Sequence, residues 1–213
     1  MSVEDILLEF ADSIQDIDNK KYDSKFISIY NELIKYYHIS GALKAGSYGK
    51  GTIVDLKGDL DIIFTIDNPE FTKVDEFRDD LANKLRQSFP YDHVERKKRS
   101  VYIKFSNGLS VDVVYLSRDE FEKEKGQIKH VKDINDKLRK IIVLIKYWKI
   151  EKKMNNIDSY MIEWNTIYSS KSDIKERIME SLAKLDINEQ TIESAYKFIF
   201  SEALRYYEEI YDD

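Results

Sequence analysis

The sequence predicts an α+β protein in which a mixed β-sheet core with flanking helices is packed against a C-terminal helical bundle. Apolar residues recur at helical spacing in residues 6–37, and strand-like segments follow between residues 41 and 116. Helical spacing returns from about residue 131 to the end. We therefore expect two domains, a mixed core over residues 1–130 and a helical domain over residues 131–213.

The individual elements follow from the spacing of apolar residues and from turn residues. Two helices are expected within residues 6–37, and residues 106–108 (Ser-Asn-Gly) are typical of a hairpin turn. Strands are expected at residues 41–47, 60–66, 91–96, 101–105 and 109–116, with a helix at 74–89. Further helices are expected at residues 134–153, 159–169, 174–182 and 192–204.

The composition excludes several classes of function. The chain has 213 residues, 42% of them hydrophobic, which is enough to bury a core. It has no Cys, so disulfides and thiolate metal sites are excluded. The net charge of −6 argues against duplex nucleic acid as the main partner, because such proteins are usually basic. A small triphosphate that arrives with its own metal ions remains compatible with this charge.

Nothing in the sequence indicates a membrane partner. The N-terminus carries Glu4, Asp5 and Glu9 without a basic segment, so we expect no signal peptide. The longest aliphatic run, Ile141–Ile145, is too short to span a bilayer. We expect a soluble, cytoplasmic protein.

The first candidate for chemistry is a pair of carboxylates, Asp59 and Asp61, at the start of an expected strand. Residues i and i+2 of a strand point to the same face, so these side chains would stand roughly 6–7 Å apart. Two like charges at this distance are unfavourable unless something neutralises them. A pair of divalent metal ions would do so and would suit a phosphoryl displacement.

A third carboxylate, Asp112, lies in an otherwise apolar expected strand. A lone charge is costly there without a partner. If this strand pairs beside residues 60–66, Asp112 could ligate the metal ion that activates an acceptor hydroxyl, or it could take the proton of that hydroxyl. Metal ligands are therefore expected at Asp59, Asp61 and Asp112.

Upstream of the carboxylates, Gly46 and Ser47 indicate a phosphate-binding turn. Glycine lets the backbone approach phosphate oxygens, and free N–H groups together with a Ser hydroxyl donate to them. Lys50 and Thr52 lie close enough in the chain to assist.

Taken together, these motifs resemble the DNA polymerase beta-type nucleotidyltransferase superfamily. The motifs that carry the resemblance are Gly46-Ser47, Lys50-Gly51-Thr52, Asp59-Leu60-Asp61 and Asp112. The Lys-Gly-Thr step and the long helical segment that follows are most similar to the branch of oligoadenylate synthetases and cyclic GMP-AMP synthase, with its bacterial relatives. The resemblance implies a fold in which the helical domain closes the nucleotide cleft.

The resemblance extends to residues 144–149 and 159–163 and covers about residues 40–170. It implies that Lys146 and Ser159 contact the triphosphate and that Tyr160 stacks on the base. Two other interpretations stay open, because Lys146 could extend to the surface and Tyr160 could be a core residue. We assign Trp148 and Trp164 to the core.

The chain also departs from the pattern of its relatives. Tyr115 stands where many relatives have Pro, and Ser159 stands where oligoadenylate synthetases have Gln. The absence of Cys excludes the zinc-binding loop of the cyclic GMP-AMP synthase group. The basic cluster Arg96–Arg99 is either a solvated hairpin tip or a contact for an acceptor or a nucleic acid. These departures leave the subfamily and the product open.

From these residues we expect a nucleotidyltransferase that uses two Mg²⁺ ions, for which Mn²⁺ can substitute. It would transfer a nucleoside monophosphate from a nucleoside triphosphate, with ATP as the preferred expectation, to a hydroxyl acceptor with release of pyrophosphate. The product could be an oligonucleotide signal, with a second nucleotide as the acceptor. Alternatively, the acceptor is a tRNA 3′ end, a protein or a small molecule, or the protein binds nucleotides without catalysis.

Overall fold

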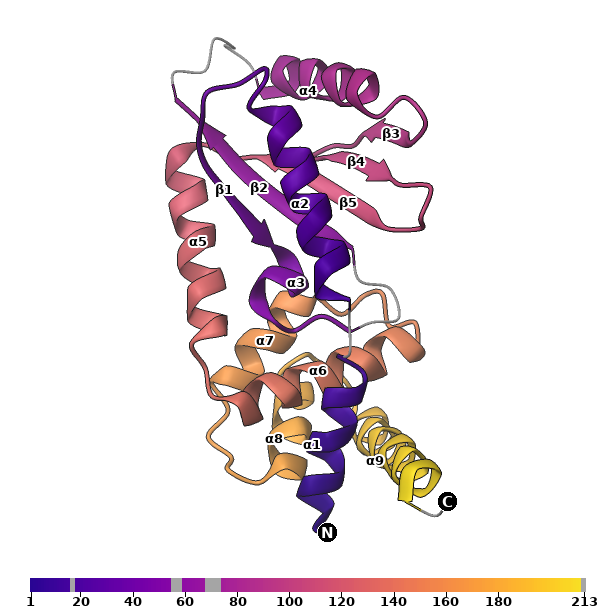
Figure 1. Ribbon diagram of the computed structural model, residues 1–213. Coiled ribbons are helices and arrows are strands. Elements are labelled where there is room, and N and C mark those ends of the chain that lie inside the picture. The colour runs from indigo at the N-terminus through magenta and orange to yellow at the C-terminus, as the bar shows by residue number, and fades with distance from the viewer. Residues whose placement is uncertain (16–17, 55–58, 68–73, 212–213) are drawn as a thin grey trace. The chain divides into compact units, whose positions relative to one another are not determined.

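The computed structural model describes residues 1–15, 18–54, 59–67 and 74–211. Within these ranges the chain forms a five-stranded sheet and nine helices (Figure 1). The strands are β1 Ile39–Ala45, β2 Leu60–Ile66, β3 His93–Arg96, β4 Val101–Lys104 and β5 Ser110–Tyr115. The helices are α1 Val3–Ser13, α2 Asn19–Leu33, α3 Gly46–Lys50, α4 Val74–Ser88, α5 Arg118–Lys132, α6 Asp136–Glu151, α7 Ser159–Ile167, α8 Ile174–Ala183 and α9 Glu189–Tyr211.

The chain divides into two compact units. The sheet unit contains the described residues of Ile17–Gly51 and Lys57–Lys132, and the helical unit contains those of Met1–Asp16, Thr52–Leu56 and Asp133–Asp213. Helix α1 therefore belongs with the C-terminal helices, and the chain passes between the units at Gly51 and Thr52.

The sheet is mixed, with strand order β1-β2-β5-β4-β3. The central strands β2 and β5 pair in parallel, whereas the other neighbours pair antiparallel. Strands β4 and β5 form the expected hairpin, and Gly108 in its turn has a φ of 85°. The mixed sheet with flanking helices confirms the predicted α+β fold.

Alternation along the central strands gives the sheet two different faces. On one face, Phe64 and Tyr115 pack against Phe77 of α4, with ring centroids 6.0 and 4.5 Å away. On the other face, Ile63 packs in a cluster with Phe121 of α5. Asp61 lies two residues before Ile63, so the carboxylate points to the face that α5 covers.

In the helical unit, α6 forms the centre of the core. Its residues Ile141–Trp148 are all buried, which is typical of a helix surrounded by other elements. Helix α1 packs in the same cluster, and a capping box between Ser2 and Asp5 fixes its start. Among the helices that the described ranges contain, none has the length and apolar character needed to cross a membrane.

Three local expectations were wrong. Residues 46–47 open the short helix α3 instead of ending a strand, and α5 was not predicted at all. Charged residues dominate α5, so only its buried Phe121, Ile128 and Val131 mark the face that packs. Trp148 is buried as expected, but Trp164 is 43% exposed and is not a core residue.

We predict that Phe121→Ala lowers the free energy of unfolding by about 3–5 kcal/mol, because the ring is 4% exposed and nothing replaces its contacts with the sheet. Urea denaturation followed by circular dichroism measures this loss. Lys129→Ala, on the exposed side of the same helix, is the matched control and should change stability by less than about 0.5 kcal/mol. Equal effects of the two substitutions would refute the packing of α5.

Candidate active site

The parallel pairing of β2 and β5 brings two of the predicted carboxylates together. Asp61 and Asp112 are register partners, so their side chains project from neighbouring strands to the same face of the sheet. Neighbouring strands lie about 4.8 Å apart. Asp59 precedes β2 by one residue and is more exposed than Asp61.

The charges of these three residues act on one another. Burial and the charges of Asp112 and Asp59 together raise the pKa of Asp61 to about 6, although Lys50 acts to lower it. Burial and the charge of Asp112 also raise the pKa of Asp59. The sheet unit therefore concentrates negative charge at this point, which a cation would stabilise.

Asp112 already has two polar partners, of which Lys97 belongs to the basic cluster noted in the sequence and Ser100 was not assigned to the site. Ser100 donates its hydroxyl to Oδ1 at 2.5 Å, and Lys97 Nζ lies 3.3 Å from both carboxylate oxygens. Both partners belong to the 97–100 turn, which joins β3 to β4. The sequence did contain a signal for this contact, because the predicted hairpin pairs the strand after this turn with the strand that carries Asp112. In the structure Tyr102 is the register partner of Asp112, so the preceding turn lies nearby.

Glycine is required at position 46 by the carboxylate of Asp61. Gly46 has a φ of 56°, and a Cβ added to it would lie 1.7 Å from Oδ2 of Asp61. The backbone thus lies directly against the carboxylate. Ser47 follows in the first turn of α3, and Lys50, which is buried, is the last residue of this helix.

The donor chemistry of Asp59, Asp61 and Asp112 fits a hard divalent cation such as Mg²⁺, which prefers carboxylate oxygens. In the side-chain conformations of the described residues, however, no three Asp, Glu, His or Cys side chains form a ready set of metal ligands. Asp112 instead accepts hydrogen bonds from Lys97 and Ser100. Ligation by Asp112 therefore requires it to exchange these partners.

Two further predicted site residues meet in the helical unit. Lys146 Nζ lies 2.6 Å from Oε1 of Glu163 and donates to Oγ1 of Thr52 at 2.7 Å. The side chains of Lys146 and Glu163 are 6% and 5% exposed, and Thr52 is fully buried. Lys146 thus does not extend to the surface, which excludes that interpretation, and Glu163 is a partner that sequence reasoning missed.

The start of α7 carries the remaining predicted residues. Ser159 accepts a hydrogen bond from Lys149 at 2.9 Å, and Asp158 caps the helix. Tyr160 is 41% exposed, so it is not a core residue, and its ring stacks on Trp164 with centroids 6.0 Å apart. Asp59, Asp61, Asp112, Gly46 and Ser47 therefore gather in the sheet unit, whereas Thr52, Lys146, Ser159 and Tyr160 belong to the helical unit.

Solved structures with the same fold are nucleotidyltransferases. CdnG, a CD-NTase from Bradyrhizobium diazoefficiens in complex with GTP, matches 85% of this chain and 76% of its own at a TM-score of 0.64 and 13% identity. The CdnE cyclic dinucleotide synthase of Elizabethkingia meningoseptica with GTP and Apcpp matches 87% of this chain and 91% of its own, at a TM-score of 0.57 and 16% identity. CdnC of E. coli MS115-1 with ATP matches 82% of this chain and 65% of its own, at a TM-score of 0.56 and 19% identity.

The chain thus spans less than two thirds of the length of CdnC. The Cid1 poly(U) polymerase with magnesium and 3′-dATP shares the fold at a TM-score of 0.56. No family model and no curated protein matches the sequence. At these identities the matches establish the fold, and this is the fold that the resemblance implied.

We predict that Gly46→Ala destabilises the protein more than Gly108→Ala, which is its matched control. Both glycines have positive φ, which costs Ala about 1–2 kcal/mol, but a Cβ meets nothing within 4 Å at Gly108. At Gly46 it meets the Asp61 carboxylate. Asp61→Ala should remove most of the excess cost, as a double-mutant cycle of thermal unfolding can measure. An unchanged cost in the Asp61→Ala background would contradict this contact.

We also predict that Lys146→Met lowers the free energy of unfolding by about 3–5 kcal/mol, because it leaves Glu163 buried and uncompensated. Adding Glu163→Leu should restore much of this loss, since no charge then remains buried. Lys149→Met removes only the hydrogen bond to Ser159 and should cost about 1 kcal/mol. Chemical denaturation of the four proteins tests the ion pair, and similar losses for both lysines would refute it.

Proposed function

We propose that this protein is a metal-dependent nucleotidyltransferase that transfers a nucleoside monophosphate from a nucleoside triphosphate to a hydroxyl acceptor and releases pyrophosphate. The observation that carries the proposal is the in-register pairing of Asp61 with Asp112 beside the backbone of Gly46. This arrangement combines acidic oxygens with a turn into which a phosphate could fit.

In this proposal Asp59, Asp61 and Asp112 hold two Mg²⁺ ions, which neutralise phosphate charge and align the displacement when they are bound. Mn²⁺ is expected to substitute. The N–H groups and hydroxyl of Gly46-Ser47 bind phosphate oxygens, and Lys50 adds positive charge close to Asp61. Catalysis depends mainly on positioning and on compensation of charge.

Asp112 also has a role in proton transfer in this proposal. Once it exchanges Lys97 and Ser100, its carboxylate can accept the proton of the acceptor hydroxyl as the oxygen attacks the α-phosphate. The bond from the α-phosphate to the bridging oxygen breaks, and pyrophosphate leaves. Lys97 then remains near the reacting groups as a cation over the ring of Tyr102.

The helical unit contributes to nucleotide binding in the same proposal. Ser159 contacts a phosphate, and the exposed ring of Tyr160 stacks on the base, which is worth roughly 1–3 kcal/mol per base. Thr52 and Lys146 were predicted to contact the nucleotide too. Both residues are buried and Lys146 donates a hydrogen bond to Thr52. Contact with a nucleotide therefore requires Lys146 to give up its ion pair with Glu163.

For the donor we propose ATP, and for the acceptor a second nucleotide, so that the product is an oligonucleotide signal. The support is that neighbours with the same fold carry ATP or GTP, and that CdnE, a cyclic dinucleotide synthase, matches over 91% of its length. A cytoplasmic location accords with these substrates and remains part of the proposal.

One observation favours a second candidate, a nucleotide-binding protein without turnover. Lys97 and Ser100 occupy the carboxylate of Asp112, and no ready set of metal ligands exists among the described residues. If this conformation persists with nucleotide bound, the protein would bind triphosphates and act through a partner.

We predict that Asp59→Ala combined with Asp61→Ala reduces nucleotide transfer by at least about a thousandfold, because the charge needed to hold the ions is removed. The melting temperature should not fall, since the substitutions also remove repulsion with Asp112. The assay combines purified protein, each labelled triphosphate, and Mg²⁺ or Mn²⁺, followed by chromatography of the products.

Asp67→Ala, at the opposite end of β2, is the matched control and should retain wild-type activity. An oligonucleotide formed without an added acceptor would support a nucleotide acceptor, whereas pyrophosphate release only with an added RNA, protein or small molecule would favour a separate one. Nucleotide binding without any turnover selects the second candidate. Full activity of the Asp59→Ala, Asp61→Ala protein would overturn the site.

A further inference from the structure

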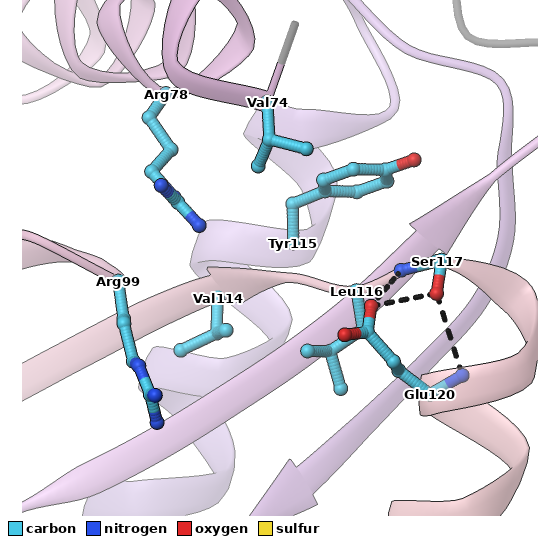
Figure 2. A pocket seen from close by; sticks show the side chains of 8 residues that line it. All are labelled: Val74, Arg78, Arg99, Val114, Tyr115, Leu116, Ser117 and Glu120. Atoms are coloured by element: carbon cyan, nitrogen blue, oxygen red, sulfur yellow. Dashed lines mark hydrogen bonds between the residues drawn. The ribbon is translucent and has the colours of Figure 1, made fainter.

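The sheet unit contains a pocket away from the carboxylates, at the end of β5 (Figure 2). Its volume is about 410 Å³, which lies within the usual range for small-molecule sites. Apolar side chains of Val74, Val114 and Leu116 line it together with the ring of Tyr115. The pocket exists because β4 pairs with β5 only as far as Val113, so the edge of the last residues of β5 is open.

Two arginines give this pocket its charge. In the view of Figure 2, Arg78 from α4 and Arg99 from the 97–100 turn lie on one side, and Glu120 of α5 lies on the other. Arg78 binds Asp75 through one terminal nitrogen at 2.9 Å, but its buried Nε has no hydrogen-bond partner within the described residues. Over the same part of the chain, Arg99 makes no ion pair. The guanidinium groups of Arg78 and Arg99 therefore give this wall of the pocket positive charge.

The single carboxylate in the pocket, that of Glu120, interacts electrostatically with Arg78 but makes its hydrogen bonds to Ser117. The carboxylate of Glu120 accepts two hydrogen bonds from Ser117, one from the hydroxyl at 2.6 Å and one from the backbone N–H at 3.0 Å. These hydrogen bonds cap the start of α5. The oxygens of carboxylate and phosphate groups match the fork of a guanidinium, and apolar walls favour a ligand with an apolar or aromatic body. The pocket thus has the chemistry for an organic carboxylate or phosphate rather than for a bare inorganic ion.

The pocket is connected to the candidate active site by a short covalent path. Arg99 stands between Lys97 and Ser100, the two residues whose side chains contact Asp112. The backbone N–H of Lys97 also donates to the carbonyl of Ser100 at 2.8 Å, and this hydrogen bond closes the 97–100 turn into a single unit. In addition, Val114 lines the pocket two residues after Asp112 on the same strand.

We propose that this pocket binds a small organic oxyanion through Arg78 and Arg99, and that the 97–100 turn transmits this binding to Asp112. A ligand that draws Arg99 toward the pocket shifts Ser100 and Lys97 relative to the carboxylate that they hold. The pocket is then an effector site, and the inference goes beyond the proposed transfer reaction because ligand binding does not depend on it.

The test is an NMR titration of ¹⁵N-labelled protein with phenylphosphonate, which combines an oxyanion with a flat apolar body. We expect shifts of the amides that line the pocket, from Val114 to Ser117, and of the amides of Ser100 and Asp112. Arg99→Gln should weaken binding about tenfold or more, because a charged hydrogen-bond donor is lost from an exposed position that does not affect folding. Lys98→Gln, the neighbouring exposed cation outside the pocket, should leave affinity unchanged.

Several results would overturn the proposal. Equal weakening by Lys98→Gln and Arg99→Gln would mean that only the general charge of the turn attracts the ligand. Inorganic phosphate that binds as tightly as phenylphosphonate would remove the role of the apolar walls. A short single-stranded oligonucleotide that displaces phenylphosphonate at lower concentration would identify a nucleic-acid contact instead. Pocket shifts without any shift at Ser100 and Asp112 would refute the transmission, and none of these readouts requires transferase activity.

Discussion

The parallel pairing of β2 with β5 is the constraint on which the rest of the candidate site depends. It sets Asp61 and Asp112 beside each other on one face of the sheet, where burial and mutual repulsion raise the pKa of Asp61 to about 6. A protein selected for stability alone would avoid this arrangement. The local structure around it consists largely of compensation, with Lys50 near Asp61 and with Lys97 and Ser100 on Asp112. Such stored repulsion is typical of sites built to receive a cation.

The segment from Gly46 to Thr52 makes close contacts at both of its ends. Gly46 lies against the carboxylate of Asp61 in the sheet unit, and Thr52 is bonded to Lys146 in the helical unit. Between them, Gly51 takes a φ of 69°, which few residues other than glycine adopt at low cost. Seven residues, Gly46 to Thr52, therefore connect the carboxylate pair along the chain to a buried ion pair on helices α6 and α7. This is a physical reason for the Gly-Ser and Lys-Gly-Thr steps to stand so near each other in the sequence.

Sequence patterns predicted the strands and the long helices because burial imposes a period of 2 or 3.6 on apolar residues. Counting residues along a strand also predicted a shared face for Asp59 and Asp61, but Asp59 lies outside β2. The sequence could place Asp112 beside Asp61 only on the condition that their strands pair, as they do. Helix α5 escaped prediction because charged residues mask a narrow apolar face of Phe121, Ile128 and Val131. Glu163 and Ser100, the partners of Lys146 and Asp112, were not predicted for a different reason. Glu163 is 17 residues from Lys146 and Ser100 is 12 residues from Asp112, and such tertiary contacts leave no periodic trace.

The magnitudes of the two ion pairs decide which predicted residue is free to act on a nucleotide. Lys97 is 40% exposed, and a pair with one partner in water is worth about 0–1 kcal/mol, so Asp112 can exchange it at little cost. Lys146 and Glu163 are almost fully buried, and separating them leaves a charge uncompensated at a cost of about 3–5 kcal/mol. A triphosphate would have to supply that energy before Lys146 contributed to binding. The energetics therefore favour Asp112 as a residue that changes partners and Lys146 as one that holds Thr52 and Glu163 in place.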